Sequence, residues 1–238
     1  VWDCMKQSIR DGIKAEGELF GGLHVQRKAK QLYNKRHIDE SAETRENRLV
    51  CSYAFAVSEQ NAACSGKIVT APTCGSCGVV PSVLRYMQEK RGFSDREILR
   101  ALAVGGLIGN LVKTNASISG AQAGCQAEIG TACAMASAAL AELFSMDIGQ
   151  IEYAAEVAVE HHLGLTCDPV KGLVQIPCIE RNAVAAMRAI NAVNLANFLA
   201  DSRKISFDLV VKTMYETGKD LSCRYRETSE GGLAKLYC

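Results

Sequence analysis

The feature that most constrains the fold is a succession of long apolar segments with helical periodicity. Hydrophobic residues recur at three- and four-residue intervals in residues 148–164 and 178–200, which places them on one face of an α-helix. Residues 206–221 form a third amphipathic segment with a glycine near its end. Residues 126–144 are rich in small residues, which permit close contact between helices. We therefore predict a helix in each of these four segments.

A further helix is predicted from its first turn. Ser94 followed by Glu97 fits the capping-box pattern, in which the two side chains satisfy backbone N–H groups at a helix start. The apolar run Ala101–Val112 that follows is about a dozen residues long, which is too short to span a bilayer and indicates a buried helix. The only strand-like segment is Lys67–Pro72. The pattern predicts an all-α protein with a single helical domain over residues 1–238.

Charge and the first residues narrow the function classes. The chain has 27 basic and 26 acidic residues, a net charge of +1, so it lacks the charge excess that attracts nucleic acid or an anionic membrane. We expect neither as a partner. The first ten residues contain no apolar stretch typical of a signal peptide. They also do not begin with Met, which is expected if an N-terminal part of the protein is absent.

Cysteine usage indicates the compartment. The chain has 11 cysteines, an odd number, in 238 helix-rich residues that do not need disulfides for stability. We expect a reducing cytoplasm, with most thiols structural and others binding metal. Cys74 and Cys77 form a C-x-x-C pair, but the βαβ surroundings of a redox site are missing. We therefore interpret Cys77 as a packed thiol.

Three polar, glycine-rich loops interrupt the apolar segments at residues 70–81, 113–126 and 161–182. Each joins apolar helices, so we expect its ends to lie near the core. Backbone groups there need partners, and ligand-binding loops often have such ends.

Cys125, Cys167 and Cys178 lie in these loops at junctions with predicted helices, close to Gly or Pro. Thiols near helix N-termini have lowered pKa values and are better metal ligands. Iron–sulfur clusters favour cysteine thiolates, and a cluster that does chemistry leaves one iron without one. Separations of 42 and 11 residues are compatible with three such ligands, but spacing alone does not identify a cluster.

Longer motifs surround these cysteines. They are TAPT (70–73), NASISGAQAGCQAEIG (115–130), EHHLGLTCDPVKGLVQIPCIERNA (160–183), TMYETGKDL (213–221) and YRETSEGGLA (225–234), followed by a C-terminal cysteine. In this order they resemble the iron–sulfur L-serine dehydratases, and the resemblance extends over essentially the whole chain.

The resemblance implies a lyase of amino-acid degradation and gluconeogenesis that deaminates L-serine to pyruvate and ammonia. Members of this family use an oxygen-sensitive [4Fe-4S] cluster and no pyridoxal phosphate, and their catalytic domain is all-helical. Cys125, Cys167 and Cys178 match the cluster ligands. The open iron is expected to act as a Lewis acid on the serine β-hydroxyl while a base removes the Cα proton.

Hydroxyl and amide groups of two loops are expected to hold the serine carboxylate and orient the Cα–H bond. These substrate-binding candidates are Thr70, Thr73, Asn115, Ser117, Ser119 and Gly120. Lys113 is expected to add positive charge toward the carboxylate.

Two further roles are predicted near the cluster. His161 is either the catalytic base or a buried residue that holds the cysteine loop. Asp168, Glu180 and Arg181 either orient the ligands or form structural pairs. Cys238 is expected to reach back as a thiolate and cap the open iron when substrate is absent; the alternative is a frayed end.

The family also works with a smaller α/β domain, fused or carried on a separate beta chain, which this sequence lacks. We therefore expect a homo-oligomer or a heterodimer. One alternative activity is an iron–sulfur L-cysteine desulfidase, in which a thiol leaves in place of the hydroxyl. Another is an inactive metal-binding fragment that holds zinc or no metal.

Overall fold

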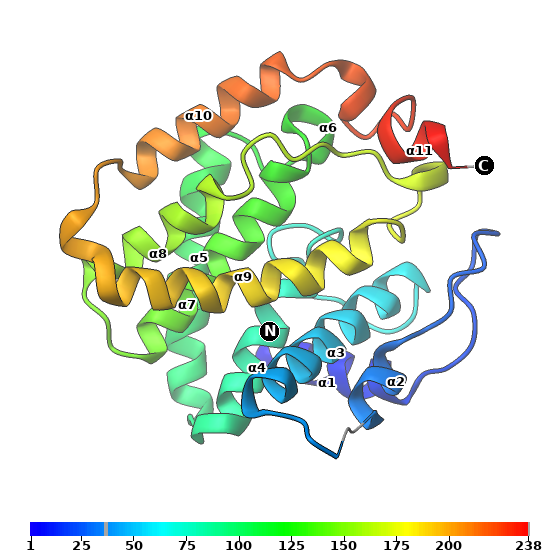
Figure 1. Ribbon diagram of the computed structural model, residues 1–238, viewed down its shortest axis with the longest axis horizontal. Helices are drawn as coiled ribbons and strands as arrows, with labels where there is room; N and C mark the ends of the chain where they lie inside the picture. The colour runs from blue at the N-terminus through cyan, green and yellow to red at the C-terminus, as the bar shows by residue number, and fades with distance from the viewer. Residues whose placement is uncertain (36–37, 238) are drawn as a thin grey trace.

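The structure is a computed structural model that describes residues 1–35 and 38–237, apart from the side chain of Ala200 (Figure 1). Within these residues it contains helices and no β-strand. The α-helices are α1 (Trp2–Lys14), α2 (Ala29–Asn34), α3 (Ala42–Ala62), α4 (Val79–Arg91), α5 (Asp95–Asn115), α6 (Gly120–Ala123), α7 (Thr131–Leu143), α8 (Ile148–Glu160), α9 (Cys178–Leu199), α10 (Phe207–Asp220) and α11 (Gly232–Leu236). The shorter elements are the π-helix η1 (Gln126–Gly130) and the 3-10 helices η2 (Val170–Gly172), η3 (Ala200–Ser202) and η4 (Cys223–Tyr225).

Helix α7 forms the centre of the core. It packs against α4, α5, α8 and α9, and 11 of its 13 residues are buried. Its alanines allow this burial because small side chains let neighbouring helices approach closely. A Cβ atom at Gly105 of α5, for example, would lie only 2.8 Å from the Met135 carbonyl oxygen of α7.

Helix α9 packs against helices from the first half of the chain and from its middle. It crosses the middle of the view in Figure 1 and contacts α3 and α4 as well as α7 and α8. Helix α10 packs on α8 and α6. The loop that precedes α9 runs past α6 toward α11, so segments distant in sequence meet at the upper right of the view.

The predicted all-α fold is confirmed, as is the capping box at the start of α5. The Ser94 side chain accepts from the Glu97 backbone N–H, and Glu97 Oε2 accepts from the Ser94 backbone N–H at 2.7 Å. Helices also occupy the four periodic segments. The alanine-rich one begins with the π-helical turn η1, which the sequence did not indicate.

Two local predictions are wrong. Lys67–Pro72 is not a strand but part of the loop from α3 to α4, where the described chain provides no partner strand. The run Ala101–Val112 is helical but not buried all round, because Leu107 is 59% exposed and Leu111 is 38% exposed. Glycine and alanine, together with Ile108 and Val112, form the buried face of α5.

None of the described helices is both long enough and apolar enough to cross a membrane.

Candidate metal centre

The three polar loops converge beside the first turn of α9. Cys178 is the first residue of α9, Cys125 immediately precedes η1, and Cys167 lies in the loop between α8 and α9. All three cysteines are buried. The sulfur atoms of Cys125 and Cys167 and a carboxylate oxygen of Glu128 lie within 4.8 Å of one another, so these three side chains could hold a metal ion.

Glu128 is the site residue that sequence reasoning missed. Its Oε1 accepts a hydrogen bond from Thr73 Oγ1 at 2.7 Å, and its Oε2 lies 4.0 Å from Cys167 Sγ. Two glycines leave room for it: a Cβ at Gly120 would lie 2.7 Å from Oε2, and one at Gly75 would lie 3.2 Å from Oε1. The sequence feature that could have pointed to Glu128 is its position, three residues after Cys125 in an otherwise apolar stretch.

The electrostatics of the thiols follow from their contacts. A hydrogen bond with Cys167 lowers the pKa of Cys125, and the Arg181 guanidinium acts in the same direction against the effect of burial. The same hydrogen bond, together with burial, raises the pKa of Cys167. Burial raises the pKa of Cys178 to about 12, with a further contribution from Cys125. Because a bound cation favours the thiolate form, metal binding here releases protons.

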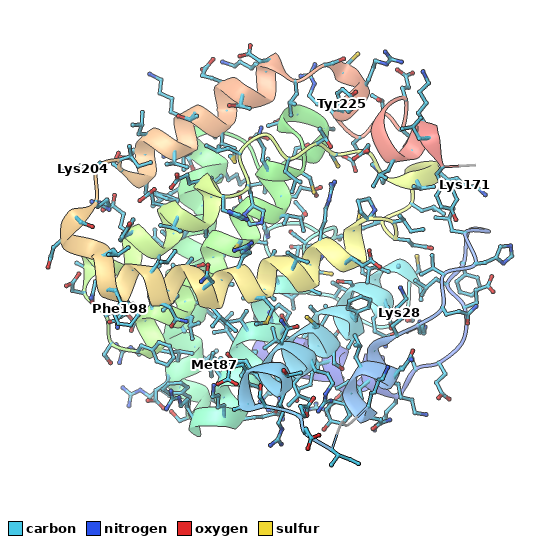
Figure 2. The ribbon with its side chains drawn as sticks, viewed as in Figure 1. Lys28, Met87, Lys171, Phe198, Lys204 and Tyr225 are labelled. Carbon is cyan, nitrogen blue, oxygen red and sulfur yellow. The ribbon has the colours of Figure 1, made fainter. Side chains whose placement is uncertain are left out.

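The Cys167 loop is held from two sides. Arg181 Nη1 donates to the Thr166 carbonyl at 2.7 Å from the α9 side. From the C-terminal side, the Cys167 backbone N–H donates to the Tyr225 carbonyl at 2.8 Å, and Glu227 N–H donates to the Cys167 carbonyl at 2.6 Å. Tyr225 lies at the upper right of Figure 2, where the C-terminal segment crosses this loop. These three hydrogen bonds therefore hold the backbone around Cys167.

Asp168 extends the contact with the C-terminal segment. Its carboxylate is buried, accepts from the Leu233 backbone N–H at 2.6 Å and lies 3.7 Å from the Arg181 guanidinium. Gly232 packs directly on this carboxylate, with no space for a Cβ and with φ at +52°. Of the residues predicted to orient the ligands, Asp168 and Arg181 thus contact the site, whereas Glu180 pairs with Lys28 at 3.4 Å.

The substrate-binding candidates divide into two groups. Thr73 and Gly120 contact Glu128, and Ser117 and Ser119 form the turn that leads into α6, in which Ser117 Oγ accepts from Ser119 N–H. The other candidates are exposed, and no hydrogen bond among the described residues joins them to Glu128 or the three cysteines. They are Thr70, Lys113 and Asn115.

His161 is exposed and lines a cavity next to the cysteines. The neighbouring His162 is the buried one, and its Nδ1 donates to the Ala158 carbonyl at 2.6 Å. Burial lowers the pKa of His162. Cys238 lies outside the described residues. Cys77 is fully buried, as predicted, and the ten described cysteines are free thiols.

Comparison with known proteins shows the family to which the chain is similar. The family model for the serine dehydratase alpha chain matches residues 1–234. An L-serine dehydratase of Haemophilus influenzae is 49% identical over 243 residues, which cover 100% of this chain and 53% of the relative. The L-serine dehydratase TdcG of Escherichia coli is also 49% identical with the same coverage, and one from Streptomyces coelicolor is 48% identical over 98% of this chain and 51% of its own length. The chain thus spans about half the length of the curated relatives it matches.

Proposed function

The chain belongs to the serine dehydratase alpha-chain family, and we propose that it carries the catalytic site of an enzyme that deaminates L-serine to pyruvate and ammonia. The observation that carries the proposal is the meeting of Cys125 and Cys167, which are 42 residues apart in sequence, with Glu128 within 4.8 Å of one another, in a chain matched over residues 1–234. Cys178 is proposed as the third thiol because it is buried and its pKa is raised in part by Cys125.

We further propose that these three cysteines hold a [4Fe-4S] cluster. The donor set supports this because thiolates are the ligands that such clusters favour. The glycine at position 120 supports it too, because a Cβ there would lie 2.9 Å from Cys167 Sγ and would crowd the space between the loops. When bound, the cluster supplies a Lewis-acidic iron for the β-hydroxyl of serine and removes the need for pyridoxal phosphate.

The chain's own residues then position the substrate. Thr73 and the Ser117–Gly120 turn are proposed to bind the carboxylate, and Glu128, which accepts from Thr73 Oγ1, is proposed to contact the α-ammonium group. Thr70, Asn115 and Lys113 are proposed to approach from the exposed side of the same loops. His161 as the base stays a prediction, and its ring lies in the neighbouring cavity.

Three features beyond the described site belong to the same proposal. Because the chain spans about half the length of its relatives, we propose that a further domain or beta chain completes the enzyme. Cys238 is proposed to cap the open iron, which the anchoring of Tyr225 and Glu227 at Cys167 would favour. A cytoplasmic location is proposed from the free thiols.

The test is anaerobic reconstitution with iron and sulfide, followed by absorption spectroscopy and a pyruvate assay with L-serine and with L-cysteine. We expect a broad band at roughly 400 nm that bleaches in air, and pyruvate from serine. Cys167→Ser should lose the band, whereas Cys133→Ser should keep it, because the buried Cys133 thiol donates to the Ala185 carbonyl and lies outside the centre. A protein that stays colourless would contradict the proposal, and the spectrum decides this even if turnover needs a further domain or chain.

A further inference from the structure

A cavity of about 490 Å³ lies directly behind the candidate metal centre. Each cysteine-bearing segment contributes a neighbour of its cysteine to the wall: Ile129 follows Cys125 by four residues, Leu165 precedes Cys167 by two, and Pro177 precedes Cys178. The described lining contains none of the three cysteines. The cavity is therefore separate from the centre but shares its supporting segments.

Two arginines give the polar part of the lining a net positive charge. Arg181 and Arg188 are seven residues apart on α9, so they project from the same face of the helix. Both guanidinium groups act on buried His162, whose pKa is lowered mainly by burial and also by His161, Arg188 and Arg181. The acidic residue in the lining, Glu180, is exposed and lies 3.4 Å from Lys28 Nζ, which lines a neighbouring hollow.

The rest of the wall is apolar. Ile129, Leu163, Leu165 and Val184 line the space between the basic groups. A ligand that complements both the basic and the apolar residues of the lining has an anionic head and a short aliphatic chain. A free ammonium group would be disfavoured, because the two arginines outnumber the one carboxylate in the lining, and that carboxylate also lies 3.4 Å from Lys28 Nζ.

We propose that this cavity binds a short-chain aliphatic carboxylate that carries no amino group. Arg188 binds its carboxylate, since guanidinium forms strong charge-assisted hydrogen bonds with carboxylates. Its carbon chain packs on Leu165 and Val184. The site is distinct from the serine site, because it takes the anion that serine would present but rejects the ammonium.

Arg181 links this cavity to the metal centre. The same side chain lines the cavity, donates to the Thr166 carbonyl at 2.7 Å and lies 3.7 Å from the Asp168 carboxylate. A carboxylate that binds beside Arg181 competes with these contacts. An occupant would therefore contact a side chain that also holds the loop carrying Cys167.

Butyrate is the probe, and its binding to the full chain is measured by saturation-transfer NMR and calorimetry, which need neither cluster nor turnover. Failure of the proposed lyase activity would thus leave this test unaffected. n-Butylamine has a comparable carbon chain with the opposite charge, and inorganic phosphate is an anion with no carbon chain. We expect butyrate to bind more tightly than either.

Arg188→Gln should weaken butyrate binding roughly tenfold or more, the loss of one charge-assisted hydrogen bond. The matched control is Arg96→Gln, an exposed arginine on α5 outside the cavity, which should leave the affinity unchanged. Val184→Asp, at a position 60% exposed and so tolerant of charge, should abolish butyrate binding and admit butylamine.

Three results would overturn the proposal. One is butyrate binding that is equally tight in the Arg188→Gln and Val184→Asp variants, and another is phosphate or butylamine binding as tightly as butyrate. The third is the absence of butyrate binding to the unmodified chain when its thermal unfolding shows that it is folded.

Discussion

The Asn182 side chain ties the loop after α3 to the start of α9. It is 1% exposed, its Nδ2 donates to the carbonyls of Gly75 and Cys178 at 2.7 and 2.8 Å, and its Oδ1 accepts from Gly78 N–H at 2.9 Å. At the residue scale, the candidate metal centre depends on such buried polar contacts, because they fix loops that have no regular structure of their own.

We predict that Asn182→Ala lowers the free energy of unfolding by roughly 2–4 kcal/mol, because three hydrogen bonds are lost and buried backbone groups are left without partners. Urea denaturation measures the change. Asn194→Ala, an exposed position on the same helix, is the control and should change stability by less than about 0.5 kcal/mol. Equal effects of the two substitutions would show that the Asn182 contacts contribute nothing.

Glu156 predicts a pH dependence of stability. Burial, and then the neighbouring Glu160, raises the pKa of this carboxyl to about 7 from 4.5. A raised folded-state pKa stabilises the protein below the unfolded-state pKa, and this contribution is lost as the pH rises through 7. Glu156→Gln, which cannot ionise, should therefore be more stable than the unmodified protein at pH 8, by on the order of 3 kcal/mol.

The advantage of Glu156→Gln should disappear near pH 4.5, where both proteins are neutral at this position. Thermal unfolding across this pH range measures it. The exposed Glu230, changed to Gln, is the control and should stay within about 0.5 kcal/mol of the unmodified protein throughout. An advantage that did not vary with pH would assign the effect to packing and not to ionisation.

The sequence indicated some site residues and not others, for physical reasons. Cys125, Cys167 and Cys178 could be singled out because thiols beside glycine and proline at helix starts form an unusual pattern. Glu128 could not, because a lone glutamate in a helix is most often solvated. Only the fold shows that Thr73, Gly75 and Gly120 enclose it, and these come from other loops.

At the scale of elements, the adjacent glycines of α5 show how packing decides what a residue contributes. A Cβ at Gly105 would lie 2.8 Å from the Met135 carbonyl oxygen of α7, whereas a Cβ at Gly106 would have no atom within 4 Å. Both lie in the interior of the same helix, where alanine is intrinsically the better helix former. Helix propensity therefore favours alanine at both positions, but contact with α7 disfavours alanine at Gly105 and not at Gly106.

Gly106→Ala should accordingly raise the free energy of unfolding by about 0.5–1 kcal/mol. Gly105→Ala should lower it by about 1–3 kcal/mol, because backbone atoms of α7 must move. Each variant is the other's control, since they share helix, substitution and neighbours in sequence. Chemical denaturation gives the two values, and a stabilising Gly105→Ala would mean that α5 and α7 are less closely packed than the structure shows.

Helices could be predicted because their signals are local. The capping box of Ser94 and the periodicity of residues 148–164 depend on neighbouring residues only. The strand at Lys67–Pro72 was predicted wrongly because a strand needs a partner that no local pattern can guarantee. The π-helical turn η1 was not predicted because its extra residue per turn depends on how Cys125 enters α7.

At the scale of the whole molecule, the C-terminal segment closes over the loop that carries Cys167. Asp168 is the anchor: its carboxylate accepts from Leu233 N–H at 2.6 Å, and Ser229 Oγ donates to the next carbonyl, that of Pro169, at 2.7 Å. Loop and segment are about 60 residues apart in sequence, so the contact exists only in the folded chain. If the anchor holds the segment, its removal should free the segment without unfolding the helices.

Asp168→Ala should therefore speed tryptic cleavage at exposed Arg224 and Lys235 roughly tenfold, the equivalent of one charge-assisted hydrogen bond. Cleavage after Arg10, which lies in α1 at the other end of the chain, provides the internal reference for global unfolding. Asp220→Ala, at an exposed end of α10, is the matched control and should leave both rates unchanged. If cleavage at Arg10 rose in parallel with cleavage at Lys235, Asp168 would stabilise the whole fold and not this segment. If neither rate rose, the remaining contacts of Ser229 and Glu227 would be sufficient to hold the segment over the cysteines.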